Sequence, residues 1–253
     1  MLLASAGTGK TNTLALRIAK IIDTSKANAD EILCLTFTNR ACKEMKERVI
    51  SMLGKEGLDI TVRTFHSFCF DVIKAEGKKK SDVSFDFIIF DEQDCMEIIE
   101  ELRYGFSAAS IQKIIDLIKP LCIDLDTTDY KRIITSLDKN HRDKLKDCCK
   151  DENYCIDYEL YNSILGEGHI LIEEYNSILS ERHALDFNDL LINAYDLLKD
   201  HNTKSIWSNR YKYIHIDEVQ DTSTREYKII SKLFSNNNVM ICGDYYQTIY
   251  LKG

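Results

Sequence analysis

Proline and glycine are scarce in this chain. Its 253 residues include one proline and 10 glycines, so the sequence has no Pro- or Gly-rich stretch of the kind that forms flexible linkers. Hydrophobic residues make up 44% and charged residues 29% of the chain, an ordinary mixture for a globular protein. The length allows one large domain or two small ones, and the scarcity of helix breakers favours helix.

Long hydrophobic runs are missing as well. No stretch of about 18 apolar residues is present, so the sequence predicts no membrane-spanning helix and no membrane partner. The first six residues lack the positive charge and the long apolar core of a secretory signal. The nine cysteines are odd in number and scattered, which favours free thiols in a reducing cytoplasm. Cys148, Cys149 and Cys155, with His141 nearby, match no common zinc-ligand spacing.

Basic residues are outnumbered. The net charge of −8 is not the footprint of a protein that binds nucleic acid through its overall charge. Any contact with DNA is therefore expected to use a local groove. The one dense basic run, Lys78-Lys79-Lys80, is more typical of a solvated loop than of a phosphate-binding track.

Strand and helix patterns alternate near both ends of the chain, which predicts a parallel sheet with covering helices. The expected strands are short apolar segments at 31–36, 61–64, 213–216 and 239–242. Helical periods dominate between them. We therefore predict an α/β fold whose sheet domain is discontinuous, over 1–84 and 184–253, and is interrupted by a mostly helical insertion over 85–183.

A phosphate-binding loop is the strongest single motif. It follows an apolar start and precedes a helical pattern, and it reads Ala4-Ser5-Ala6-Gly7-Thr8-Gly9-Lys10-Thr11. Glycines let backbone N–H groups turn inward around phosphate oxygens, and the helix start adds its positive dipole end. In such a loop Lys10 reaches the β- and γ-phosphates and Thr11 ligates Mg²⁺. Ala4 stands where the general pattern has glycine.

Two segments are candidates for the acids that a phosphate-binding loop requires. Asp91-Glu92 and Asp217-Glu218 both follow short apolar runs. Asp91 opens the helical insertion, with no strand–helix unit around it. Asp217 is followed by a helix and by a second strand that ends in Gly243-Asp244, as a sheet edge facing a nucleotide requires. We assign Asp217 to Mg²⁺ and Glu218 to the attacking water, and we expect Asp91 and Glu92 to cap a helix.

Five further motifs resemble, in order, those of the UvrD/Rep/PcrA-like superfamily 1 DNA helicases. They are similar to the family's "TFTN(K/R)A", "TFHS", "DFxDLL", "DExQD" and "GDxxQSIY" segments, and they lie at Leu35–Ala41, Thr64–Ser67, Leu185–Leu191, Asp217–Asp221 and Gly243–Tyr250. Ala4 also fits, because this family often begins its phosphate loop with alanine. The resemblance covers nearly the whole chain and implies a RecA-like sheet domain.

The resemblance also implies roles for single residues. Gln247 corresponds to the glutamine that senses the γ-phosphate. With Lys10, Asp217 and Glu218 it makes up the expected catalytic residues. Phe37 and Tyr250 fall where aromatic side chains stack on single-stranded DNA, although core packing is the ordinary role of an aromatic residue. Thr36, Asn39 and His66 are expected to contact the DNA backbone or neighbouring bases.

By resemblance, the chain is the N-terminal ATP-binding portion of an ATP-dependent helicase, of 3′-to-5′ direction, with a possible nuclease or repair subunit as partner. The family's adenine-binding segment and its second RecA-like domain fall outside this sequence. We therefore expect weak nucleotide binding and no unwinding by this chain alone. The alternative is a truncated, non-catalytic nucleotide- or DNA-binding module. A P-loop kinase or GTPase is disfavoured, because no guanine-reading Asn-Lys-x-Asp segment is present.

Three positions depart from the family pattern. Asn12 stands where many members have arginine, and Tyr246 stands where many have aspartate. The motif that ends at Tyr250 is followed by Leu251-Lys252-Gly253 without the usual aromatic residue. A base-stacking contribution from that last position is therefore not expected.

Overall fold

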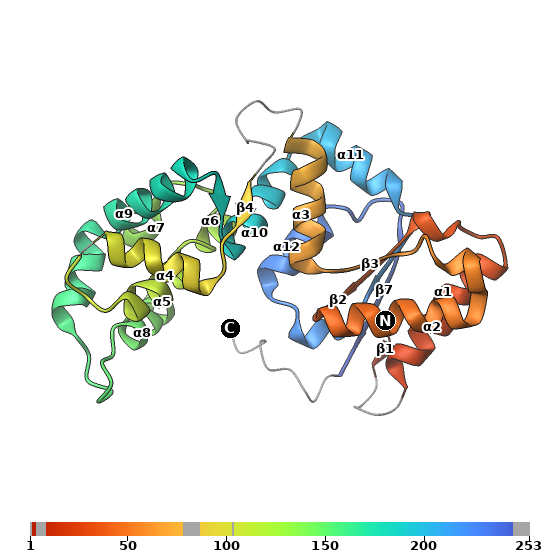
Figure 1. Ribbon diagram of the computed structural model, residues 1–253, viewed down its shortest axis with the longest axis horizontal. Helices are drawn as coiled ribbons and strands as arrows, with labels where there is room; N and C mark the ends of the chain where they lie inside the picture. Colours follow the sequence, from red (N-terminus) through yellow and green to blue (C-terminus); the bar gives the residue numbers. More distant parts are fainter. Residues whose placement is uncertain (1, 4–8, 78–86, 103, 245–253) are drawn as a thin grey trace. The chain divides into compact units, whose positions relative to one another are not determined.

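The computed structural model describes residues 2–3, 9–77, 87–102 and 104–244. The chain divides into two compact units (Figure 1). We call Met1–Glu76 with Ala194–Gly253 the sheet unit, and Gly77–Asn193 the helical unit. The sequence pattern had suggested boundaries at 84/85 and 183/184. Within the described ranges, no helix is long and apolar enough to cross a membrane.

The sheet unit is built on a five-stranded sheet in the order β1-β7-β6-β2-β3. The strands are β1 Leu2–Leu3, β2 Ile32–Thr36, β3 Thr61–Thr64, β6 Tyr213–Ile216 and β7 Asn238–Gly243. All four pairings are parallel. The predicted α/β fold with a parallel sheet is confirmed, and every residue of β2 is buried, as a central strand of such a sheet requires.

Helices flank this sheet (Figure 1). They are α1 Lys10–Asp23, α2 Asn39–Leu53, α3 Phe65–Glu76, α11 His201–Arg210 and α12 Thr224–Ser231, with short 3₁₀ turns η1 Ala29–Glu31, η2 Gly54–Gly57 and η4 Val219–Asp221. Leu14 and Ile18 of α1 share a buried cluster with Met45 and Val49 of α2. Their helical spacing explains why both segments fold as amphipathic helices against the strands.

The helical unit contains α4 Glu92–Glu101, α5 Ala108–Ile118, α6 Leu121–Leu125, α7 Tyr130–Thr135, α8 Lys139–Cys148, α9 Tyr158–Glu181 and most of α10 Phe187–Leu197. It also contains a two-stranded parallel sheet of β4 Ile88–Ile89 and β5 Ala184–Leu185. The prediction that no strand–helix unit surrounds Asp91 was wrong here. Strands of two residues are too short to show a hydrophobic periodicity in the sequence. In addition, Ile88 is 55% exposed, whereas a strand inside a parallel sheet is normally buried.

Asp91 is the N-cap of α4, as predicted. Its carboxylate accepts hydrogen bonds from the backbone N–H groups of Gln93, at 2.9 Å, and Asp94, at 3.0 Å. The Asp94 side chain accepts from the Asp91 N–H in return. This reciprocal arrangement satisfies N–H groups that the first turn of a helix leaves without partners. The carboxylate of Asp91 therefore serves the local structure of the helical unit, and Glu92 is the first residue of the helix.

A buried lysine holds the beginning of α10. Lys119, fully buried between α5 and α6, lies 2.7 Å from an oxygen of Asp186 and 2.8 Å from an oxygen of Asp189. Asp186 also accepts from the Asp189 N–H at 2.7 Å and from the Tyr175 hydroxyl at 3.1 Å. The ammonium group thus compensates two carboxylates that also cap the helix.

His215 is a second buried polar residue, in the middle of β6. It is fully buried. Burial, with the nearby charge of Arg17, lowers the pKa of His215 to about 3. The imidazole is therefore neutral in the folded protein near neutral pH.

Replacing Lys119 with methionine is expected to destabilise the helical unit by about 3–5 kcal/mol, because two buried carboxylates lose their cation. Hydrogen–deuterium exchange of peptides from α5 and α10 measures the loss. Lys144→Met, at an exposed position of α8 in the same unit, is the matched control and should leave exchange unchanged. Equal protection of both variants would contradict the role given to Lys119.

Replacing His215 with methionine is expected to reduce the acid sensitivity of the sheet unit. The folded-state pKa lies below the unfolded value, so stability is full above about pH 6.5 and falls as the unfolded chain takes up a proton. Between pH 7 and pH 5 the free energy of unfolding therefore falls by about 2 kcal/mol, and this decrease should be absent in the variant. Urea unfolding followed by the fluorescence of Trp207, the one tryptophan of the chain, measures it. His201→Gln, at an exposed histidine, should keep the parent's pH dependence; an identical slope in His215→Met would refute the assignment.

Candidate nucleotide and DNA site

The carboxyl ends of the central strands gather several polar side chains. Thr36 ends β2, Asp217 follows β6, and Asp244 follows β7. β6 pairs in parallel with both β2 and β7, so these three residues lie along one edge of the sheet. In open α/β sheets this edge is where ligands bind. The sequence prediction that β6 and β7 are neighbouring strands ending in polar residues is confirmed.

The start of α1 brings a lysine and a threonine to the acids after β6. The Lys10 ammonium lies 3.8 Å from a carboxylate oxygen of Glu218, and the lysine side chain is only 5% exposed. The Thr11 side chain forms a hydrogen bond with the carboxylate of Asp217. Four of the residues assigned to nucleotide chemistry from the sequence therefore lie together.

Asp217 is a buried carboxylate whose charged form is disfavoured by its surroundings. Its side chain is nearly completely buried. Burial raises the pKa of Asp217, the nearby charge of Glu218 raises it further, and the hydrogen bond from Thr11 and the charge of Lys10 oppose this rise. A carboxylate beside a hydroxyl offers the oxygen ligands that Mg²⁺ prefers. The residues present fit a site for Mg²⁺ held by Thr11 and Asp217.

Gln220 links the turn after β6 to the end of β7. Its amide Nε2 donates to Glu218 at 2.7 Å, and its Oε1 accepts from the backbone N–H of Asp244 at 2.9 Å. Glu218 has a φ of 50°, in the left-handed region. The sequence pattern included Gln220 in a motif without giving it a role. Only the tertiary structure shows that it joins two segments 24 residues apart.

Gly243 is required for this close approach. A Cβ atom at this position would lie 2.7 Å from Cγ1 of Val219 and 2.9 Å from Oε1 of Gln220. Side-chain carbons essentially never approach other heavy atoms so closely. The absence of a side chain at Gly243 therefore lets η4 pack against the end of β7.

The remaining nucleotide assignments are only partly described. Gly9 has a φ of 84°, a left-handed conformation that favours glycine, and its carbonyl accepts from the N–H of Thr13 as α1 begins. The other predicted loop residues, Ala4, Ser5, Ala6, Gly7 and Thr8, lie outside the described residues. Gln247 and Tyr250, like the basic run at 78–80, also lie outside them.

A second group of predicted residues surrounds the end of β2. Phe37 is 47% exposed, so core packing does not account for this aromatic side chain. Asn39 is exposed at the first turn of α2, whose N-cap, Thr38, accepts from the N–H of Ala41. Thr36 instead is 1% exposed, and its hydroxyl donates to the carbonyl oxygen of Thr38 at 3.2 Å. Its side chain shapes the turn that carries Phe37.

His66 lies on α3, directly after β3. It is half-buried, and burial lowers its pKa, with the charge of Glu226 opposing this shift. The neighbouring Thr64 hydroxyl donates to Ser67 at 2.9 Å and also accepts from the Ser67 N–H, which fixes the strand-to-helix turn. Because β3 pairs with β2 along Leu33–Thr36, Thr36 and Thr64 are directly opposite each other.

Comparison with known proteins gives a consistent result. The sequence model of the UvrD/REP helicase N-terminal domain matches residues 1–251. A relative from Mycoplasma capricolum subsp. capricolum, named "Probable DNA helicase II homolog", is 33% identical over 264 residues, which cover 98% of this chain and 32% of the relative. "ATP-dependent DNA helicase PcrA" from Staphylococcus epidermidis is 30% identical over 255 residues, covering 99% of this chain and 32% of that protein. The chain thus spans about a third of the length of the curated relatives that it matches.

Proposed function

The chain belongs to the UvrD/REP helicase family, and we propose that it is the part of an ATP-dependent DNA helicase that binds ATP with Mg²⁺ and single-stranded DNA. One observation carries this proposal: Lys10 and Thr11 of α1 lie beside Glu218 and Asp217 at the carboxyl edge of the sheet. Phosphoryl transfer from ATP requires this set of a lysine, a hydroxyl and two acids.

Each of these side chains has a chemical task in ATP hydrolysis. Lys10 binds the β- and γ-phosphates, where its charge offsets the charge that develops on the transferring group. Thr11 and Asp217 hold Mg²⁺, which neutralises phosphate charge when it is bound. Glu218 orients the attacking water and accepts its proton. The positive end of α1 adds to the field that favours phosphate.

The link through Gln220 relates this chemistry to the segment after β7. Gln220 contacts Glu218 on one side and the backbone of Asp244 on the other. Gln247, the proposed γ-phosphate sensor, follows Asp244 by three positions in the sequence. We infer that the Gln220 amide fixes the starting point of that segment relative to the catalytic carboxylate.

The proposed DNA contacts lie at the ends of β2 and β3. The exposed Phe37 ring offers a face on which a base stacks without regard to sequence. Asn39 and His66 offer polar contacts to the backbone or to neighbouring bases. We propose the same base-stacking role for Tyr250 and an indirect role for Thr36, whose buried hydroxyl holds the turn.

Translocation and unwinding are proposed for the whole protein rather than for this chain. They need a second RecA-like domain that closes on ATP and opens after hydrolysis, and whose arginines raise the rate by about 10³–10⁵. The 3′-to-5′ direction, a cytoplasmic location and a repair or nuclease partner stay predictions. The alternative, a truncated non-catalytic nucleotide- or DNA-binding module, predicts binding without ATP turnover by this chain. ATPase turnover by this chain on single-stranded DNA, at a rate comparable to that of an intact motor, would contradict it.

Lys10→Ala and Asp217→Asn are expected to weaken binding of a fluorescent ATP analogue in different ways. Loss of the ammonium should reduce affinity at least about tenfold with or without Mg²⁺, because a direct phosphate contact is lost. Asp217→Asn should selectively abolish the gain in affinity that Mg²⁺ gives. Titrations of this chain, with and without Mg²⁺, measure both effects.

Asp91→Asn is the matched control for these variants. Asparagine is as good a helix N-cap as aspartate, so nucleotide affinity and its Mg²⁺ dependence should be unchanged. In the full-length protein, Lys10→Ala should also abolish DNA-stimulated ATP hydrolysis. If Asp91→Asn, and not Asp217→Asn, removed the Mg²⁺ dependence, the assignment of the metal-binding acid would be reversed.

Phe37→Ala is expected to weaken the binding of single-stranded DNA. Loss of one stacked base costs about 1–3 kcal/mol, or roughly fivefold to over a hundredfold in Kd. Fluorescence anisotropy with a labelled oligothymidine at fixed salt measures it. Leu58→Ala, which removes another exposed apolar side chain of the sheet unit (48% exposed), should leave the affinity unchanged; equal losses in the two variants would argue against stacking on Phe37.

A further inference from the structure

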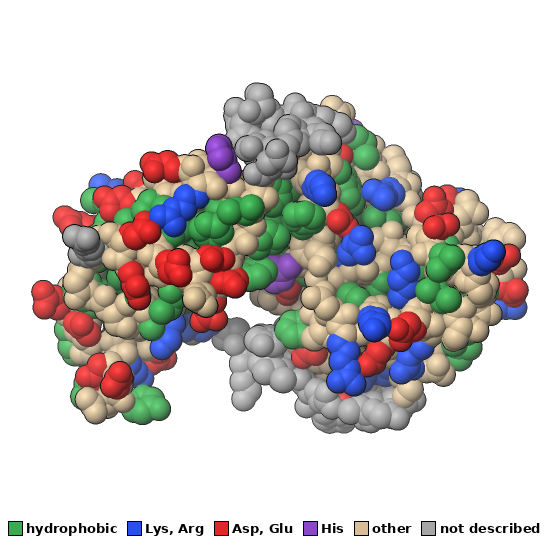
Figure 2. Space-filling view, viewed as in Figure 1, with side chains coloured by type: hydrophobic (Ala, Val, Ile, Leu, Met, Phe, Trp, Pro, Cys, Tyr) green, Lys and Arg blue, Asp and Glu red, His purple; other side chains and the backbone are tan. Residues whose placement is uncertain are grey.

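The two units of the chain differ in charge. The helical unit holds 25 of the 41 acidic side chains and 14 of the 33 basic ones, whereas the sheet unit holds 16 acidic and 19 basic side chains. On the face drawn in Figure 2, acidic side chains gather over the helical unit. Such a surface repels DNA phosphates and attracts cationic partners.

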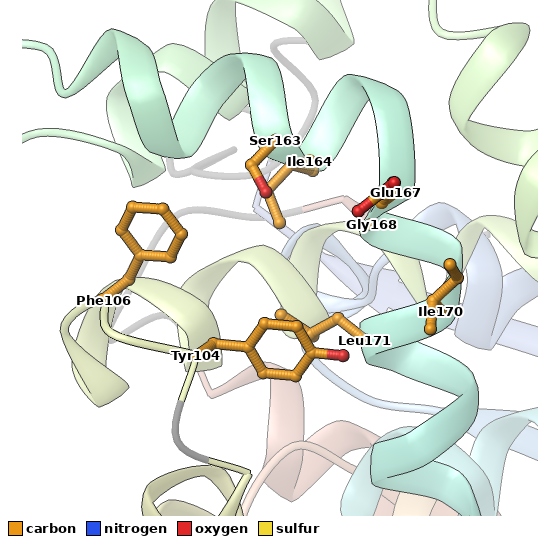
Figure 3. A pocket seen from close by; sticks show the side chains of 8 residues that line it. All are labelled: Tyr104, Phe106, Ser163, Ile164, Glu167, Gly168, Ile170 and Leu171. Atoms are coloured by element: carbon orange, nitrogen blue, oxygen red, sulfur yellow. The ribbon is translucent and has the colours of Figure 1, made fainter.

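The helical unit also has a recess between α9 and the connection from α4 to α5. The recess is small and is partly open to solvent. Tyr104 and Phe106 of the connection form one side, and Ile164, Ile170 and Leu171 of α9 line the other (Figure 3). The lining is mainly aromatic and aliphatic, and Ile170 is 41% exposed. This is the composition of a site that accepts an apolar side chain.

The wall formed by α9 is fixed by close packing beneath it. A Cβ atom on Gly168 would lie 2.9 Å from Cγ2 of Ile164 and 3.3 Å from Cδ1 of Ile134. Glycine at this position therefore lets α9 approach α7 closely. Because the packing is tight, the recess is present before any ligand arrives, which reduces the entropic cost of binding.

Two carboxylates border the recess. The Tyr104 hydroxyl donates to Glu174 at 2.6 Å, and Glu167 lies along the lining. Both glutamates are exposed, and in the part of the chain that the structure describes neither forms an ion pair with a lysine or arginine. Burial, together with the hydrogen bond to Glu174 and the charge of Glu167, raises the pKa of Tyr104 to about 12. The phenol therefore remains protonated and keeps its hydrogen bond to Glu174.

We propose that this recess docks a basic segment of a partner protein, which inserts an aliphatic or aromatic side chain between Tyr104 and α9 and pairs a neighbouring lysine or arginine with Glu167 and Glu174. An apolar wall bordered by two exposed carboxylates is complementary to that combination and not to a nucleic acid strand. Every lining residue belongs to the helical unit, whereas the residues of the proposed nucleotide and DNA site belong to the sheet unit.

Three fluorescein-labelled 12-residue peptides test the proposal with the whole chain. One alternates leucine with lysine, one serine with lysine, and one leucine with glutamate. We expect the leucine–lysine peptide to bind at least about tenfold more tightly than the others, because it alone offers both apolar and cationic groups. Its binding should shift the methyl NMR signals of Ile164, Ile170 and Leu171.

Matched variants separate docking from general charge attraction. Glu167→Gln/Glu174→Gln, which keeps an acceptor for Tyr104, should raise the Kd of the leucine–lysine peptide about fivefold, as expected for the loss of two exposed ion pairs. Ile170→Ser should weaken it similarly. Glu173→Gln, which removes one carboxylate charge from an exposed α9 position outside the lining, should leave the Kd unchanged.

Three results would overturn the proposal. The first is an equal loss of affinity in Glu173→Gln and in the double variant. The second is peptide binding without any shift of the lining methyl signals. The third is a single-stranded oligothymidine that shifts the same methyl signals, which would assign the recess to nucleic acid.

Discussion

The parallel pairing of β6 with β7 is the constraint on which the proposed nucleotide site depends. Ile216 lies opposite Ile241, so Asp217 and Asp244 leave the sheet at the same edge. The side chain of Gln220 joins Glu218, next to Asp217, to the backbone of Asp244, and the absence of a side chain at Gly243 leaves room for it. The same two acids contact the lysine and threonine that begin α1.

The buried carboxylates of the two units differ in how they are paired with cations. In the helical unit, Lys119 contacts two carboxylates directly, at 2.7 and 2.8 Å. In the sheet unit, Asp217 is buried and has the hydroxyl of Thr11 as a partner, and the charge of Lys10, whose ammonium group lies 3.8 Å from Glu218, lowers its pKa. In the helical unit, the direct ion pairs with Lys119 compensate the charge of the two carboxylates. Among the described residues, Asp217 has no such direct pairing, which is consistent with the proposed Mg²⁺ site.

The uneven distribution of charge gives the two units different classes of partner. Basic residues slightly outnumber acidic ones in the sheet unit, where polyanionic nucleotide and DNA are proposed to bind. The helical unit is acidic, and its apolar recess is bordered by Glu167 and Glu174, which suits a cationic partner rather than a polyanion. The overall charge of −8 is therefore a sum over two unlike surfaces. It describes neither surface, because screening limits each charge to its own neighbourhood.

The sequence by itself determined the parallel α/β fold, the helical interruption and the pairing of Lys10 and Thr11 with the acids at Asp217 and Glu218. These features have strong local signals: apolar strands of regular length, glycines at phosphate-loop spacing, and acids directly after a strand. The cap at Asp91 was predictable for the same reason, because a helix end depends on the few residues around it.

Only the tertiary structure decided how distant segments meet. The strands β4 and β5 are two residues long, so the sequence has no hydrophobic periodicity from which their pairing could be predicted. The partners of Lys119 lie 67 residues or more away, the contact of Gln220 with Asp244 spans 24 residues, and the recess beside Tyr104 joins two separate elements. Thr36 was assigned to DNA from its motif, yet the fold buries its hydroxyl against the turn. Local preference specifies a residue's own backbone, whereas burial and long-range contacts depend on the packing of the whole unit.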